Sequence, residues 1–71
     1  MERAELVQGI KELCEANKLK LVDDIAIGHS ILIIVRGDKC KDLLEEHLSS
    51  LGLEHTEPAM IADGIGSYVT L

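Results

Sequence analysis

Three of the seven basic residues in this chain gather around a cysteine in the segment Arg36-Gly37-Asp38-Lys39-Cys40-Lys41. The segment stands where a strand is expected to pass into a helix, and the N–H groups and dipole at a helix start attract anions. The sequence therefore predicts a binding site for an anionic small molecule at Arg36, Lys39, Cys40 and Lys41. Ordinary electrostatics at a helix start is the alternative interpretation.

The Cys40 thiol is a second source of chemistry in this segment. Its lysine neighbours and the helix start favour a reactive thiolate, as in a nucleophile or a redox sensor. The same cysteine belongs to the apolar stripe of the expected helix, where it serves as a small hydrophobic side chain. No general base is evident beside it, so the sequence assigns no catalytic residue.

The histidines and glycines match no established motif. His55 and Glu57 share one face of an expected strand, but this is not a metal-ligand pattern, and we assign neither a metal nor a cofactor. His47 lies on an apolar helix stripe, which is typical of a hydrogen-bonded histidine at a core edge or subunit contact. The segment 63–67 lacks the Lys-Ser/Thr ending of a phosphate loop and predicts a hairpin turn.

Charge and composition exclude several classes of function. The net charge of −6 and the single aromatic residue, Tyr68, argue against nucleic acid and against an anionic membrane surface. Cys14 and Cys40 form neither a CxxC pair nor a disulfide framework. There is no signal-peptide pattern and no apolar run of transmembrane length, so we expect a cytoplasmic protein.

The elements that position these residues follow from hydrophobic periodicity. An amphipathic helix is expected over Glu2–Ala16, with Asn17 as its left-handed stop. Strand residues between Leu19 and Ile27 follow, and near Asp23-Asp24 we expect either a bulge or the meeting of two shorter strands. Gly28-His29 fits a two-residue hairpin turn, and Ser30–Arg36 forms the next strand.

The second half of the chain is expected to have the same order of elements, one helix followed by two strands. Asp38 is expected to cap a helix over Lys39–Leu51, and Gly52 marks its left-handed exit. A strand runs from Leu53 toward Glu57 and resumes at Met60–Ala62. A turn over 63–66 then leads to a last strand, Ser67–Leu71.

The resulting order, α-β-β-α-β-β, predicts one small α+β domain over residues 1–71. Two helices cover one face of a four-stranded antiparallel sheet with spatial order 3-4-2-1. This two-layer sandwich is a circularly permuted ferredoxin-like fold. The half from Gly28 onward also resembles the C-terminal domain of the AIR-synthase superfamily in its strand, Leu/Glu-rich helix, glycine exit and Ile-Ala-Asp-Gly-Ile-Gly turn. It carries none of the nucleotide-binding residues of that superfamily, and we assign no family.

The strand Ile31-Leu32-Ile33-Ile34-Val35 is apolar throughout, which is typical of a strand buried on both faces. Two helices cover only one face, so Leu32 and Ile34, or their neighbours, are left on the other, where Val22 and Ala26 are expected to join them. We predict that Leu32, Ile34 and Val22 form a homo-oligomer interface. Cover by the C-terminal strands, or an apolar ligand, are the alternatives.

These observations favour a non-enzymatic, self-associating module that acts through a protein partner or as a regulatory subunit. A binder of an anionic small molecule at 36–41 is the first alternative. A thiol-dependent enzyme or redox sensor that uses Cys40 is the second.

Overall fold

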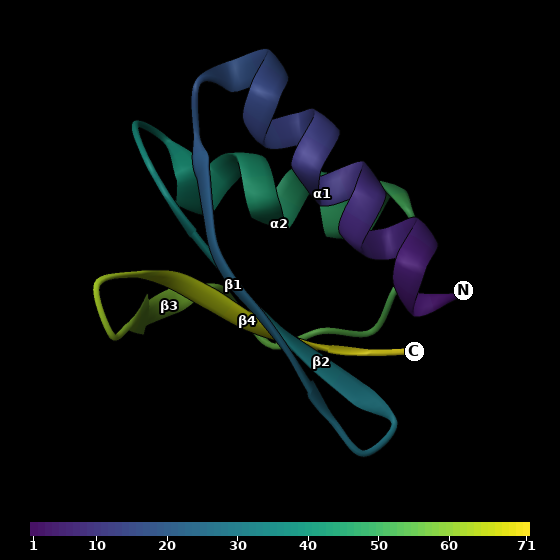
Figure 1. Ribbon diagram of the computed structural model, residues 1–71. Coiled ribbons are helices and arrows are strands. Elements are labelled where there is room, and N and C mark those ends of the chain that lie inside the picture. The colour runs from purple at the N-terminus through teal and green to yellow at the C-terminus, as the bar shows by residue number, and fades with distance from the viewer.

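The computed structural model describes residues 1–71 as a two-layer α+β sandwich, in which both helices lie on one side of a single sheet (Figure 1). This confirms the predicted fold class. The elements in chain order are α1 (Arg3–Asn17), β1 (Lys20–Ile27), β2 (Ser30–Arg36), α2 (Cys40–Ser50), β3 (Ala59–Ile61) and β4 (Gly64–Thr70).

The sheet has the order β1-β2-β4-β3, and every neighbouring pair is antiparallel. β2 therefore lies inside the sheet, as its continuous apolar sequence predicts. The spatial order is the predicted one, because the crossover through α2 leaves one strand position free and β4 fills it. The β1–β2 and β3–β4 hairpins extend past the helices in opposite directions (Figure 1).

Ile31, Ile33 and Val35 point toward the helices and are fully buried. They form one core with apolar residues of both helices and of β4. The other members of that core are Leu6, Ile10, Cys14, Cys40, Leu44, Leu48 and Val69. Aliphatic side chains and two thiols thus provide the burial for which many small domains use aromatic rings.

The helix boundaries agree with the predictions except at single residues. Lys18, with φ 57°, ends α1 in the left-handed conformation, and Asn17 is still helical, because its side-chain amide donates to the Leu13 carbonyl at 2.9 Å. Asp38 does not cap α2. Lys39 is the N-cap residue, with φ 60° and no side-chain cap hydrogen bond. Gly52, at φ 68°, forms the predicted left-handed exit.

β1 pairs with β2 through the predicted Gly28-His29 turn, and its bulge falls at Val22, between Leu21 and Asp23. His55 makes only an isolated bridge to Val69, so the predicted strand from Leu53 toward Glu57 is not formed, and the chain rejoins the sheet as β3, close to the predicted Met60–Ala62.

The predicted turn over 63–66 is wrong. Ala62 and Asp63 form the turn, and β4 already begins at Gly64. Gly64 lies in the ladder because the sheet leaves no room for a side chain there. A Cβ at this position would lie 2.7 Å from the carbonyl oxygen of Val35 and 2.9 Å from Cγ2 of Ile34.

Candidate functional site

The segment 36–41 connects β2 to α2, but the structure does not gather its cations around one point. The Arg36 guanidinium pairs with Asp63, with Nη1 3.1 Å from Oδ2, and the Lys41 ammonium lies 4.0 Å from a carboxylate oxygen of Glu57. Lys39 occupies the N-cap position. Two of the three positive charges therefore already face a carboxylate, which weakens the attraction for an external anion.

A cavity of about 360 Å³ opens beside this segment. Arg36, Gly37 and Cys40 line one side, and residues 60 and 62–65 of the β3–β4 hairpin line the other. Lys39 and Lys41 are not among its lining residues. Because Arg36 and its partner Asp63 both line the cavity, the cavity wall carries no net charge. This wall therefore offers an anion no excess positive charge.

Cys40 is the nucleophilic side chain of this cavity, and it is 7% exposed. No histidine lines the cavity, so no imidazole is available there as a general base for the thiol. Cys14 lies in the same core cluster and is also buried. Burial, and secondarily the neighbouring Cys40, raise the pKa of the Cys14 thiol.

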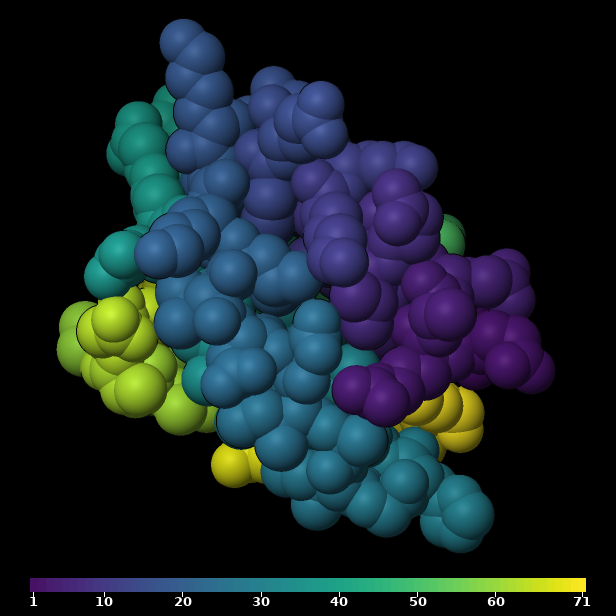
Figure 2. Space-filling model, viewed as in Figure 1, coloured from purple at the N-terminus to yellow at the C-terminus, as the bar shows by residue number.

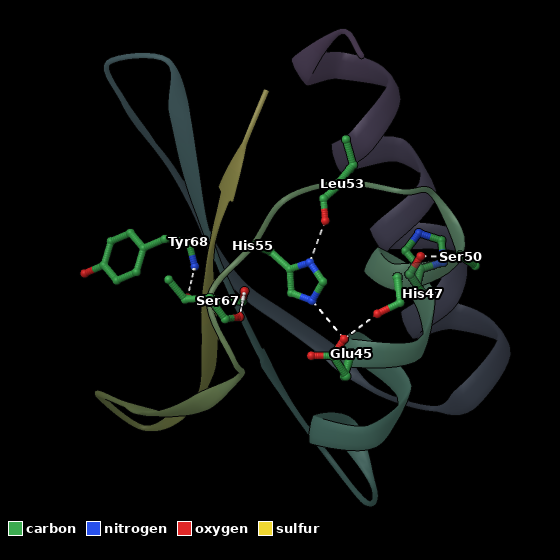
Figure 3. A network of polar contacts seen from close by, with 9 residues as sticks. Glu45, His47, Ser50, Leu53, His55, Ser67 and Tyr68 are labelled. Carbon is green, nitrogen blue, oxygen red and sulfur yellow. Dashed lines mark hydrogen bonds and ion pairs between the residues drawn. The ribbon is translucent and has the colours of Figure 1, made fainter.

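His55 and Glu45 form a polar network between α2 and the sheet that was not predicted (Figure 3). Nδ1 of His55 lies 2.7 Å from the carbonyl oxygen of Leu53, and Nε2 lies 2.9 Å from Oε2 of Glu45. Both ring nitrogens thus face acceptors, and only an imidazolium, which donates from both, satisfies them. The Ser49 hydroxyl donates to the same Glu45 oxygen.

These contacts shift the two ionisations in opposite directions. The hydrogen bond to Leu53 raises the pKa of His55 above its ordinary 6.5, and Glu45 adds to this effect, while burial opposes it. Hydrogen bonds from Ser49 and then His55 lower the pKa of Glu45. When protonated, which the raised pKa favours, His55 is a charged structural link, and neither of its nitrogens then has a free lone pair for a metal or for general base catalysis.

His55 and Glu57 have different partners, because His55 reaches Glu45 while Glu57 lies near Lys41. No group of three or more His, Cys, Asp or Glu side chains is placed to hold a metal ion. Neither helix has the length and apolar character needed to cross a membrane. No local pattern predicts the His55–Glu45 pair, since this pair depends on how the chain returns after Gly52.

His47 lies between the helices and differs from its prediction as a hydrogen-bonded residue, because its buried Nε2 has no partner. The ring packs against Gly9 of α1, where an added Cβ would lie 3.5 Å from Nε2. A shallow cavity of about 180 Å³ borders it, lined also by Leu13, Leu43 and Glu46. A Cβ at position 9 would be in ordinary van der Waals contact with the ring, so the ring does not itself require a glycine there.

The face of the sheet opposite the helices, which we call the open sheet face, carries a cross-strand row of large side chains. Ile25, Leu32 and Tyr68 stand opposite one another on β1, β2 and β4. Ile25 is 41% exposed and Tyr68 is 44% exposed, whereas Leu32 between them is 6% exposed. Figure 3 shows Tyr68 on the far side of the sheet from both helices. Ile27, next along β1 on the same face, is 48% exposed.

The predicted interface residues therefore take different positions. Leu32 and Ile34 do lie on the open sheet face, but they form its buried floor. Ile61 of β3 covers Gly66, the residue opposite Ile34, where an added Cβ would lie 2.8 Å from Ile61 Cδ1. The alternative prediction, in which a C-terminal strand covers this face, therefore holds at Ile34.

The residues expected to join them from β1 are corrected by the register. Val22 is the bulge residue and has no cross-strand partner, and Ala26 pairs with Ile31, so Ala26 lies on the helix-covered face. Sequence reasoning missed Ile25 and Ile27 because the bulge shifts the alternation of β1 by one residue. Tyr68 joins them through the register of β4 against β2.

Comparisons of the chain with protein-family models, with curated proteins and with solved structures give no match.

Proposed function

We propose that this protein is a self-associating interaction module whose open sheet face binds a second copy of the same chain. The observation that carries the proposal is the cross-strand row in which Ile25 and Tyr68 flank Leu32 on a face that no helix covers. Half-exposed isoleucine and tyrosine side chains gathered on one face are typical of an interface, and tyrosine is enriched in interface centres.

The absence of charge in the row permits a second copy as the occupant. The protein carries a net charge of −6, but the side chains of the row are uncharged. Asp23, which pairs with Ile34, lies at the border of the row. Two copies meet there with little opposition between carboxylates, and salt screens the remaining repulsion between the acidic molecules. Association through this face is expected to strengthen with ionic strength, whereas binding to a basic partner weakens with salt.

The dimensions of the molecule set the strength of such a dimer. Its two longer extents are 28 and 23 Å, which limits a flat contact to roughly 600 Å² on each protomer, at the small end of specific interfaces. Dimerisation is therefore expected to be reversible and to depend on protein concentration.

Sedimentation velocity over a wide range of protein concentration, at low and at moderate salt, tests the proposal. The expected result is a monomer–dimer equilibrium that shifts toward the dimer as salt rises. A monomer at every concentration and both salt conditions overturns self-association. A dimer that dissociates as salt rises overturns the apolar face as its cause.

A further inference from the structure

The two cysteines of the chain lie in one corner of the core, at the ends of the two helices. Cys14 is in the last turn of α1 and Cys40 is the first residue of α2. Both thiols belong to the same buried cluster, and they are 4% and 7% exposed, respectively.

A short chain of contacts holds these two helix ends together. The Leu19 N–H donates to the carbonyl of Cys14 at 2.8 Å, and the Cys40 N–H donates to the carbonyl of Gly37 at 3.4 Å. Leu19 and Gly37 are in close contact, since a Cβ on Gly37 would lie 3.2 Å from the Leu19 Cα. Gly37 has φ 141°, a conformation that favours glycine, so this close approach is built into the backbone.

Only one of the two thiols lines a cavity. Cys40 lines the 360 Å³ cavity beside segment 36–41, whereas Cys14 does not. A small molecule that enters this cavity therefore meets Cys40 first, with Cys14 behind it in the core. A thiol at a cavity wall, backed by a second thiol in the core, is the arrangement that resolves a mixed disulfide.

We propose that Cys14 and Cys40 form a redox-active dithiol that low-molecular-weight disulfides convert to an intramolecular disulfide. Cys40 loses its proton to solvent and attacks one sulfur of the small disulfide, so that a mixed disulfide forms and one small thiolate leaves. Cys14, deprotonated in turn, attacks Sγ of Cys40 and displaces the second small thiolate. The two protein thiols are oxidised, and the small disulfide is reduced to two thiols.

The bond would join the end of α1 to the start of α2. Both residues lie in terminal helical turns, which adjust at lower cost than helix interiors to the spacing that a disulfide needs. Closing the loop between residues 14 and 40 restricts the unfolded chain, and chain entropy predicts a folded-to-unfolded ratio higher by roughly a few hundredfold. Oxidation would then stabilise the fold, independently of whether the open sheet face self-associates.

The test is incubation of the folded protein with oxidised glutathione, followed by alkylation of free thiols and intact-mass analysis under denaturing conditions. The expected product is a single chain that has lost two hydrogen atoms, takes up no alkylating agent and yields one peptide pair that contains Cys14 and Cys40. In Cys14→Ala, Cys40 is expected to retain one glutathione. In Cys40→Ala, Cys14 is expected to remain a free thiol.

Three results would overturn the dithiol: two free thiols after prolonged incubation, a stable mixed disulfide on the unsubstituted chain, or a disulfide between two chains. Circular dichroism confirms that each alanine variant is folded. The peptide map of the unsubstituted protein decides the question if a variant is not folded.

Discussion

Replacing Ile25 by aspartate places a carboxylate in the centre of the proposed dimer contact while leaving the helix-covered core untouched. Ile25 lies on β1, an edge strand, and pairs across the ladder with Leu32. Figure 2 shows β1 running along the molecular surface between α1 and the β3–β4 hairpin. The side chain is accessible in the monomer, so its replacement is expected to affect association more than folding.

The size of the effect follows from the exposure of this residue. Full burial of an isoleucine side chain stabilises by about 1.5–3 kcal/mol. Since 41% of Ile25 is exposed in the monomer, about 1 kcal/mol of that burial is left for the interface in each protomer. A two-fold dimer contains the residue twice, so Ile25→Thr should weaken association by about 2 kcal/mol, or roughly 30-fold. Ile25→Asp adds two unpaired buried carboxylates and should weaken it at least about 1000-fold.

Sedimentation velocity on the two variants measures this loss, and thermal unfolding shows whether each remains folded. Leu51→Asp is the matched control, because Leu51 ends α2 in the other layer and is similarly exposed, at 39%. It introduces the same charge and should leave the dimer intact. Equal dimerisation by Ile25→Asp and the unsubstituted protein would refute the assignment of the interface, as would equal weakening by Leu51→Asp.

Three further outcomes test the packing that positions the site. Gly64→Ala would place a methyl group 2.7 Å from the carbonyl oxygen of Val35, and should cost about 2 kcal/mol in urea unfolding; an unchanged midpoint would contradict the close approach. Leu44→Ala removes a fully buried core side chain and should cost about 3 kcal/mol, a large fraction of the stability of so small a domain, so a loss below about 1 kcal/mol would contradict its burial. His55 has a raised pKa, so it stabilises the fold below its unfolded pKa and loses this effect as pH rises through the folded pKa. Glu45 has a lowered pKa and loses its contribution in acid. His55→Gln should therefore destabilise most below pH 6.5, the ordinary pKa of histidine, and progressively less as pH rises above it, and a difference independent of pH would disprove the charged link.

Local sequence features predicted most of the scaffold. The uninterrupted apolar run Ile31–Val35 indicates an internal strand, and an internal strand constrains the order of its neighbours. Gly28 and Gly52 stand in positive-φ conformations at the predicted turn and helix exit. These features depend on backbone preferences within a few residues, which a single sequence displays directly.

The glycines of β4 show where such reasoning fails. Gly64 and Gly66 look like turn residues in the sequence, but they are strand residues whose missing side chains admit Ile34 and Ile61. Ala62 takes the positive-φ position of the turn instead, with φ 54°. A glycine required for close packing cannot be distinguished from a glycine required for a turn until the neighbouring strand is in place.

The candidate sites also combine features that the sequence predicts with features that depend on the tertiary structure. Composition alone identified an acidic chain with one basic segment around Cys40, and periodicity placed that cysteine at the start of a helix. Only the tertiary structure pairs Arg36 with Asp63. The same holds for the placement of Cys14 in one buried cluster with Cys40. The tertiary structure also buries Leu32 and moves the exposed part of the open sheet face to Ile25 and Tyr68. Periodicity determines which face of an element a side chain occupies, but the partners of that side chain depend on register, bulges and chain reversals, which are decided when distant segments pack together.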